Sequence, residues 1–210
     1  MPVWVKICGL TNVADALAAA AAGADALGFM FYEPSRRNLS PAAAAEIIRE
    51  LPSFIAKVGV FVNPTMEFVH STIETSRLDT LQFHGEETPE FCAQFGLPVF
   101  KAFRVKDCSV LAQCANFRDC AWLLDSHVDG ALGGTGVAFD WDVAVEATKI
   151  HPQVILAGGL KVETVADAVR RVRPHGVDVS SGVESAPGKK DYFRVCDFIL
   201  AAKSVEADQR

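Results

Sequence analysis

The sequence lacks any apolar run long enough to cross a membrane, because charged residues interrupt each hydrophobic stretch before the roughly 18 to 20 residues that a spanning helix needs. It also lacks a basic flank and cleavage pattern at its amino terminus, so no signal peptide is indicated. Positive charge is not in excess: 20 Lys and Arg face 26 Asp and Glu, for a net charge of -6. This balance argues against a nucleic acid or an anionic membrane as a partner.

The six cysteines include no CxxC pair, which argues against both a zinc site and a disulfide framework in a chain of 210 residues. Scattered cysteines of this kind are typical of reduced thiols, so we expect a cytoplasmic protein without a bound metal. The cysteines are Cys8, Cys92, Cys108, Cys114, Cys120 and Cys196.

What the sequence does contain is a strand-then-helix pattern repeated eight times. Apolar, β-forming runs are expected at 3–8, 25–31, 55–62, 80–84, 98–103, 120–125, 154–157 and 176–179. Helical segments are expected at 13–23, 40–51, 64–76, 89–95, 110–117, 141–149, 161–172 and 191–203. Eight such units predict an α/β fold, the (β/α)8 TIM barrel of eight parallel strands with outer helices. Because no linker or change in composition divides the sequence, we expect one domain over 1–205 and a frayed tail over 206–210.

The main competing fold is an open, doubly wound sheet. A dinucleotide-binding sheet of that type would carry G-x-G-x-x-G after its first strand. The chain instead gives Cys8-Gly9-Leu10-Thr11-Asn12 at that point. The number of units and this missing motif both favour the barrel.

Two lone reactive side chains end apolar strands, where barrels of this class gather their catalytic groups. Cys8 is either an inert buried thiol or a base, and the helix that follows favours its thiolate form. Asp125 follows Trp122-Leu123-Leu124, and such apolar neighbours favour the neutral carboxyl that a general acid needs. Lys6 shares the inward face of Cys8 and requires a buried partner, for which Asp178 is the candidate.

The loops after the seventh and eighth strands indicate phosphate binding. Gly158-Gly159 and Ser180-Ser181-Gly182 offer close backbone approach and hydroxyl donors at the usual phosphate site of barrels. The alternative is a pair of tight turns without a ligand. Arg37 is suited to a planar carboxylate, while His84 is equally a ligand contact or a rim histidine.

With these residues the sequence resembles the phosphoribosylanthranilate isomerases of tryptophan biosynthesis. The similar segments follow the family's order over nearly the whole chain. They include Val5-Lys6-Ile7-Cys8-Gly9, Ser35-Arg36-Arg37, Leu81-Gln82-Phe83-His84-Gly85, Leu123-Leu124-Asp125-Ser126, Gly133-Gly134-Thr135-Gly136, Ala157-Gly158-Gly159-Leu160 and Val177-Asp178-Val179-Ser180-Ser181-Gly182-Val183-Glu184.

The resemblance implies an Amadori rearrangement of N-(5-phosphoribosyl)anthranilate to 1-(2-carboxyphenylamino)-1-deoxyribulose 5-phosphate. It implies that Asp125 is the general acid and Cys8 the general base, that Arg37 holds the anthranilate carboxylate and that Asp178 orients the anthranilate nitrogen. His84 and Gly136 are expected at the substrate, and the glycines and serines named above at the phosphate. No cofactor, metal, nucleic acid or membrane is implied, and we expect a monomer rather than a homodimer.

One departure from the family is Asn38, which stands where an aromatic or β-branched residue is common and leaves the packing of that loop open. Two other functions remain as alternatives. One is a related phosphosugar synthase or epimerase, which would require a Lys/Glu pair or a metal-binding His/Asp set. The other is a phosphosugar-binding barrel without catalysis, against which the presence of both Cys8 and Asp125 argues.

Overall fold

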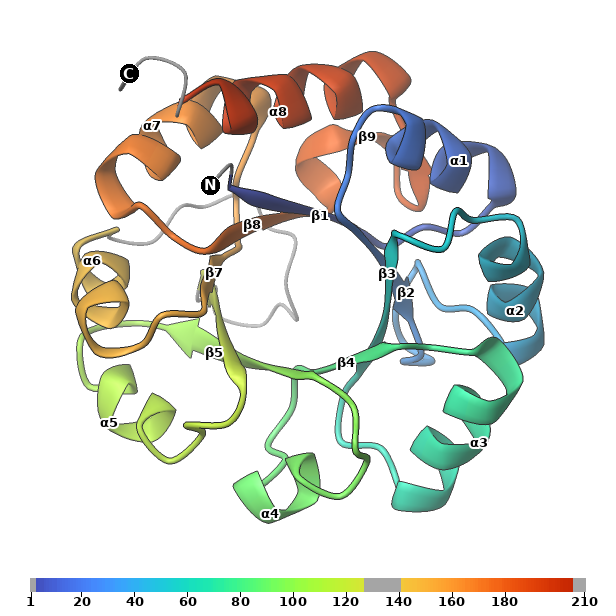
Figure 1. Ribbon diagram of the computed structural model, residues 1–210, viewed down its shortest axis with the longest axis horizontal. Coiled ribbons are helices and arrows are strands. Elements are labelled where there is room, and N and C mark those ends of the chain that lie inside the picture. Colours follow the sequence, from blue (N-terminus) through green and yellow to red (C-terminus); the bar gives the residue numbers. More distant parts are fainter. Residues whose placement is uncertain (1–2, 127–140, 206–210) are drawn as a thin grey trace.

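Eight parallel strands close into a barrel with helices outside it, as Figure 1 shows for the computed structural model, which describes residues 3–126 and 141–205. Neighbouring strands pair in chain order, and the last pairs with the first. The closed barrel confirms the predicted fold and excludes the open sheet. Gly136 and the tail 206–210 lie outside the described residues.

The elements follow the predicted order. The barrel strands are β1 (Trp4–Cys8), β2 (Ala26–Met30), β3 (Ala56–Phe61), β4 (Thr80–Phe83), β5 (Val99–Val105), β6 (Ala121–Ser126), β7 (Val154–Leu156) and β8 (Gly176–Val179). The helices are α1 (Val13–Ala21), α2 (Pro41–Arg49), α3 (Met66–Ser76), α4 (Pro89–Cys92), α5 (Val110–Cys114), α6 (Trp141–Ile150), α7 (Val162–Val172) and α8 (Tyr192–Ser204). The helices α4 and α5 are shorter than predicted, with four and five residues.

Local sequence explains where several helices begin. The side chain of Asn12 accepts a hydrogen bond from the backbone N–H of Asp15 at the start of α1. Ser40 caps α2 in the same way, with Pro41 at the first helical position. Each cap satisfies one N–H group that has no partner within its helix. The helices therefore begin close to where the sequence predicted.

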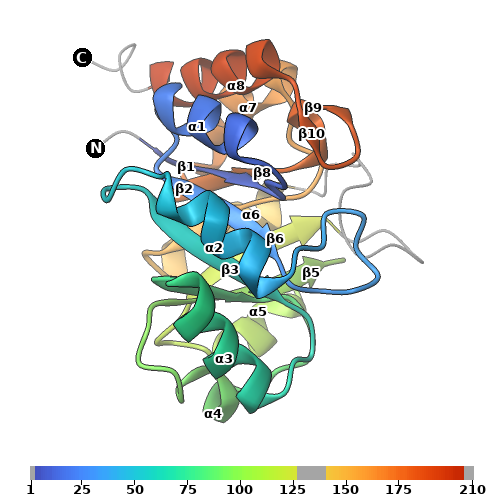
Figure 2. The same cartoon turned by 90° about the vertical axis from the view of Figure 1, so that its right-hand side faces the viewer.

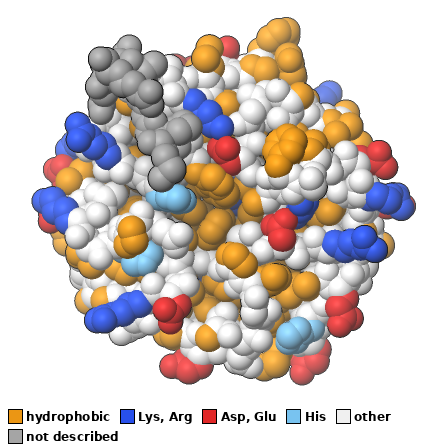
Figure 3. All heavy atoms as spheres, in the orientation of Figure 1, with side chains coloured by type: hydrophobic (Ala, Val, Ile, Leu, Met, Phe, Trp, Pro, Cys, Tyr) orange, Lys and Arg blue, Asp and Glu red, His pale blue; other side chains and the backbone are white. Residues whose placement is uncertain are grey.

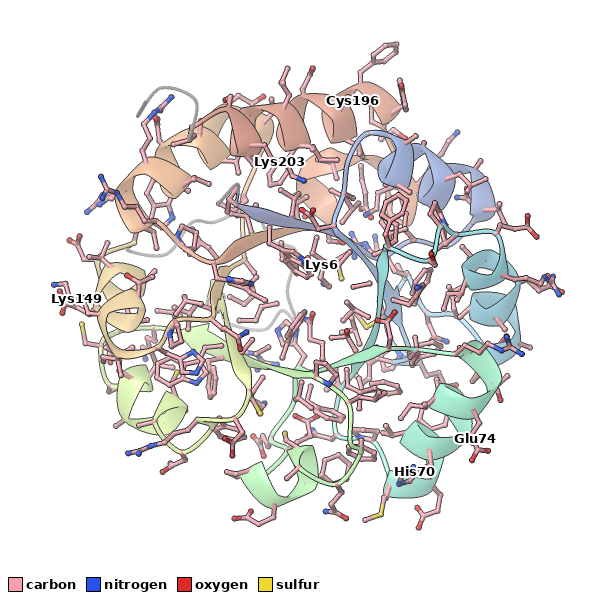
Figure 4. The ribbon with its side chains drawn as sticks, in the orientation of Figure 1. Lys6, His70, Glu74, Lys149, Cys196 and Lys203 are labelled. Carbon is pink, nitrogen blue, oxygen red and sulfur yellow. The ribbon has the colours of Figure 1, made fainter. Side chains whose placement is uncertain are left out.

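Alternation along the strands divides the interior into two cores. Val5 and Ile7 point outward from β1 into a large apolar cluster between strands and helices. Trp4 points inward and packs edge-on against Phe100 of β5, beside a small cluster within the barrel. Because side chains alternate along a strand, Lys6 and Cys8 point inward from β1 on the same face as Trp4. Figure 4 shows Lys6 inside the ring of strands, whereas Lys149 lies on an outer helix.

A short insertion between β8 and α8 was not predicted. A single 3-10 turn, η1 (Ser181–Val183), leads into a hairpin of β9 (Glu184–Ala186) and β10 (Lys189–Lys190). In Figure 2 the hairpin lies beside α1 and α8, at the end of the barrel toward which the strands point. The segment lacks the alternating apolar pattern of a strand, since its buried residues are charged. It brings Glu184 and Lys190 to the mouth of the barrel.

The opposite end of the barrel is the one at which the strands begin. Figure 3 shows that end, with apolar side chains gathered near its centre and charged side chains around its edge. None of the helices in the described ranges is long and apolar enough to cross a membrane.

Candidate active site

A cavity of about 300 Å³ opens at the carboxyl ends of the strands. Every predicted site residue that the structure describes lines it, and Gly136 is the one that lies outside the described residues. The lining includes Cys8, Arg37, His84, Asp125, Gly158, Gly159, Asp178, Ser180, Ser181 and Gly182. The sulfur and carboxyl groups singled out as base and acid therefore share one cavity, which is a requirement for their acting on one substrate.

Below this cavity, Lys6 links Cys8 to Asp178. Lys6 has no exposed surface, and its Nζ donates a hydrogen bond to Oδ1 of Asp178 at 2.8 Å. The two residues are direct register partners on β1 and β8, and their pairing confirms the predicted partner. Gly28 shows how tightly Cys8 and Lys6 pack: a Cβ atom there would lie 2.7 Å from Cys8 Sγ and 3.1 Å from Lys6 Cε.

Burial changes the pKa of Cys8 in the direction opposite to the one that the helix start favours. Burial raises the pKa of the Cys8 thiol above its ordinary value, and the Asp178 carboxylate adds to this, although the Lys6 ammonium opposes it. Burial acts to lower the pKa of Lys6, but the attraction of Asp178 and Cys8 outweighs it and raises that pKa. At Cys8, burial therefore opposes the thiolate form that the helix start was predicted to favour. The desolvation of the sulfur outweighs the favourable charges around it.

Arg37 faces a carboxylate of the protein. Its Nε and Nη2 donate to the two carboxylate oxygens of Glu184 at 2.7 and 2.6 Å. This hydrogen-bonded pairing raises the pKa of Arg37. Lys190 donates to the same carboxylate at 2.9 Å and to the carbonyl oxygen of Ser180 at 3.2 Å. The guanidinium group of Arg37, which was expected to bind a ligand carboxylate, thus binds Glu184. The hairpin thereby fixes Arg37 at the edge of the cavity.

Across the cavity, three polar side chains form a chain from β4 to β6. Gln82 and His84 share a face of β4, and Gln82 Nε2 lies 3.4 Å from His84 Nδ1. His84 Nε2 lies 3.1 Å from Oδ2 of Asp125, but outside hydrogen-bond geometry. The histidine is therefore more than a solvated rim residue, since it links the interior of the barrel to the candidate acid.

The two loops predicted to bind phosphate lie against each other. Gly158 and Gly159 have φ angles of 74° and 69°, a left-handed conformation that other residues rarely adopt. A Cβ atom at Gly182 would collide with the carbonyl oxygen of Leu160, so a larger residue would force the loops apart. Lys190 adds positive charge behind Ser180. Backbone amides, hydroxyl groups and this charge suit an anion.

Metal chemistry is not indicated in the part of the chain that is described, because no group of three or more His, Cys, Asp or Glu residues there could hold a metal ion. The residues that sequence analysis missed are Glu184, Lys190 and Gln82. Glu184 and Lys190 lie in strands of three and two residues, which are too short to leave a periodic signal. Gln82 was visible only as a polar residue sharing the inward face of His84.

The family model described as N-(5'phosphoribosyl)anthranilate (PRA) isomerase matches residues 5–201. An N-(5'-phosphoribosyl)anthranilate isomerase of Geotalea uraniireducens is 53% identical over 201 residues, covering 96% of this chain and 98% of the relative.

Two solved structures are also similar. The phosphoribosyl anthranilate isomerase of Thermotoga maritima superposes with a TM-score of 0.92 at 41% identity, covering 96% of this chain and 99% of that one. A phosphoribosyl anthranilate isomerase in complex with reduced 1-(o-carboxyphenylamino)-1-deoxyribulose 5-phosphate gives a TM-score of 0.88 at 41% identity with the same coverage.

Proposed function

The chain belongs to the N-(5'-phosphoribosyl)anthranilate isomerase family, and we propose that Cys8 and Asp125 are the two groups that move protons in its reaction. It is an isomerase of tryptophan biosynthesis, and its substrate is N-(5-phosphoribosyl)anthranilate. The observation that carries the assignment is the single cavity that both side chains line. A shared cavity allows one bound sugar to meet an acid and a base.

In the proposed mechanism, Asp125 gives its proton to the furanose ring oxygen as the C1–O bond breaks, which leaves an open-chain protonated imine. Cys8, as the thiolate, then takes the proton from C2 to give a neutral enol-amine. The enol-amine becomes the ketone when C1 gains a proton and the 2-hydroxyl group loses one. Lys6 supplies the counter-charge that the buried thiolate needs. His84 stands next to Asp125, with its Nε2 3.1 Å from Oδ2.

The ends of the substrate are assigned by charge. Asp178 accepts a hydrogen bond from the anthranilate nitrogen, and its own position is fixed by Lys6. Arg37 meets the anthranilate carboxylate through Nη1, since Nε and Nη2 are turned to Glu184. The phosphate group lies at Gly158, Gly159, Ser180, Ser181 and Gly182, supported by their backbone conformation and by the charge of Lys190.

Assembly and location are part of the same proposal. We expect a monomer in the cytoplasm, with all six cysteines reduced; the five cysteines other than Cys108 are at least partly buried as free thiols. Sedimentation of the purified protein tests the assembly, and a stable dimer would contradict it.

The decisive test is rescue of a tryptophan-requiring strain that lacks this isomerase, combined with turnover of the purified enzyme. We expect wild type to rescue growth, and Cys8→Ala and Asp125→Asn each to abolish turnover while still binding the reduced product analogue. Cys196→Ala, on the outer helix α8, is the matched control for removal of a thiol. Near wild-type turnover by Cys8→Ala would show that another residue is the base. A folded wild type that fails to rescue would favour the non-catalytic barrel.

A further inference from the structure

Gln82 lines the cavity and carries a buried polar atom without a partner. Its side chain is almost fully buried on β4 and lines the same cavity as Cys8 and Asp125. Its Oε1 has no hydrogen-bond partner among the described residues. Buried polar atoms without partners are rare because leaving one unsatisfied is costly. In a residue that lines a binding cavity, an atom of this kind indicates that a ligand supplies the missing bond.

The neighbour of Gln82 limits what that ligand group can be. One end of the amide faces His84 Nδ1 at 3.4 Å, so the other end is the one left without a partner. If the amide nitrogen faces the histidine, the cavity meets an oxygen acceptor; if the amide is reversed, it meets an N–H donor. A hydroxyl group satisfies either arrangement because it both donates and accepts.

We propose that Gln82 is a substrate-binding residue whose amide hydrogen-bonds a sugar hydroxyl of the phosphorylated substrate. This inference rests on the proposed function, which supplies a ribosyl group with hydroxyls next to the reacting carbons. The bond holds the sugar chain between Cys8 on β1 and Asp125 on β6. Through His84, which lies 3.1 Å from Asp125 Oδ2, the same contact keeps the acid aligned with the sugar.

The inference predicts opposite effects on stability and on binding. Gln82→Met keeps the approximate volume and removes the unsatisfied atom, so the free protein is expected to melt about 2 °C higher. The same variant is expected to bind the reduced product analogue about tenfold more weakly, because a hydrogen bond to the sugar is lost. Calorimetry measures both. Unchanged affinity, or a melting temperature well below wild type, would overturn the proposal.

Analogues identify the hydroxyl and test the contact without relying on one variant. Reduced product analogues that each lack one sugar hydroxyl are titrated into wild type, Gln82→Met and Gln82→Leu. We expect one analogue to lose about tenfold in affinity for wild type and almost nothing for the folded variants. If each analogue lost the same affinity for wild type and for the variants, the proposed hydrogen bond between Gln82 and the sugar would be contradicted. If neither variant folds, the wild-type series decides alone, since no loss for any analogue contradicts the proposal.

Thr80→Val is the matched control, because Thr80 lies two residues earlier on the same face of β4, outside the lining of the cavity. Its hydroxyl is already bonded to Oδ1 of Asp79 at 3.1 Å, so its removal is expected to lower the melting temperature and leave binding unchanged. Turnover separates the two proposals. An inactive wild type refutes the proposed function, whereas an active wild type with unaffected Gln82 variants refutes only the role of Gln82.

Discussion

Two of the buried lysine–carboxylate pairs lie on different sides of the barrel and have different roles. Lys6 and Asp178 join β1 to β8 beneath the cavity, and Asp178 and the neighbouring Cys8 line it. Lys101 and Glu87 pair at 3.1 Å beside β4 and β5, and neither lines the cavity. Both lysines are almost fully inaccessible. Burial and pairing alone therefore do not distinguish a catalytic group from a structural one.

The partners of each pair explain the difference. Lys101 also donates to the carbonyl oxygen of Gly85 at 2.7 Å, and Glu87 accepts hydrogen bonds from the backbone N–H groups of Asn63 and Gly85. That network ties the ends of β3 and β4 together through the backbone. Lys6 instead acts on two side chains that reach the cavity, Asp178 and Cys8. One network holds loops in place, and the other holds reacting groups.

The largest difference between the two pairs is expected in the rate of catalysis. Asp178→Asn removes the charge opposite Lys6 and leaves only a neutral amide oxygen to accept from the substrate nitrogen, so kcat/KM is expected to fall by about 100-fold or more. Steady-state kinetics with the folded variant measures this. A loss below about threefold would mean that the first pair, like the second, is structural.

The second pair is expected to affect stability instead. Glu87→Gln leaves the Lys101 ammonium buried without a counter-charge, which is expected to lower the free energy of unfolding by about 3 kcal/mol. Urea denaturation measures the loss, and kcat of the folded fraction should equal that of wild type. A fall in kcat of about tenfold would show that the network also reaches the active site.

A methyl group placed beneath the sulfur gives a smaller effect. In Gly28→Ala the new Cβ would lie 2.7 Å from Cys8 Sγ, so the sulfur must shift and kcat is expected to fall about tenfold with little change in KM. Gly59→Ala, on the adjacent strand β3, would press against Leu78 and Phe61 on the helix side. This control is expected to lose stability while kcat of the folded enzyme is kept. Equal kcat in both variants would contradict the packing argument.

The smallest expected effect is a shift in a pH profile. Cys8 faces Lys6 and Asp178, and more distantly Lys190 and Arg37. Because burial raises the pKa of Cys8, its alkylation by iodoacetamide, followed by mass spectrometry, is expected to rise only at a pH above that of a cysteine peptide. Losing a cation disfavours the thiolate, so Lys6→Met is expected to move the midpoint about one unit higher. Lys101→Met is the control, and its midpoint for Cys8 alkylation is expected to equal that of wild type. A shift as large as that of Lys6→Met would show that the two lysines affect Cys8 equally.

Much of the fold could be predicted because strands and helices repeat with their own periods. The alternation in β1 placed Trp4, Lys6 and Cys8 on one inward face, and β8 was predicted with its observed limits. The helices α4 and α5 were overestimated because their apolar residues continue into turns that pack on the same core. The hairpin β9–β10 was missed because its buried residues are charged and its pairing depends on contacts far away in the sequence.

The sequence by itself determined the barrel, the candidate acid and base at the strand ends, and the family, because these depend on residue order and on periodic patterns. Only the tertiary structure decided that Glu184 engages Arg37, that Gln82 lines the cavity with an unpartnered buried oxygen, and that burial raises the pKa of Cys8. These properties depend on desolvation and on contacts between residues separated by up to 172 positions, as for Lys6 and Asp178. Local sequence does not encode the environment that such contacts create.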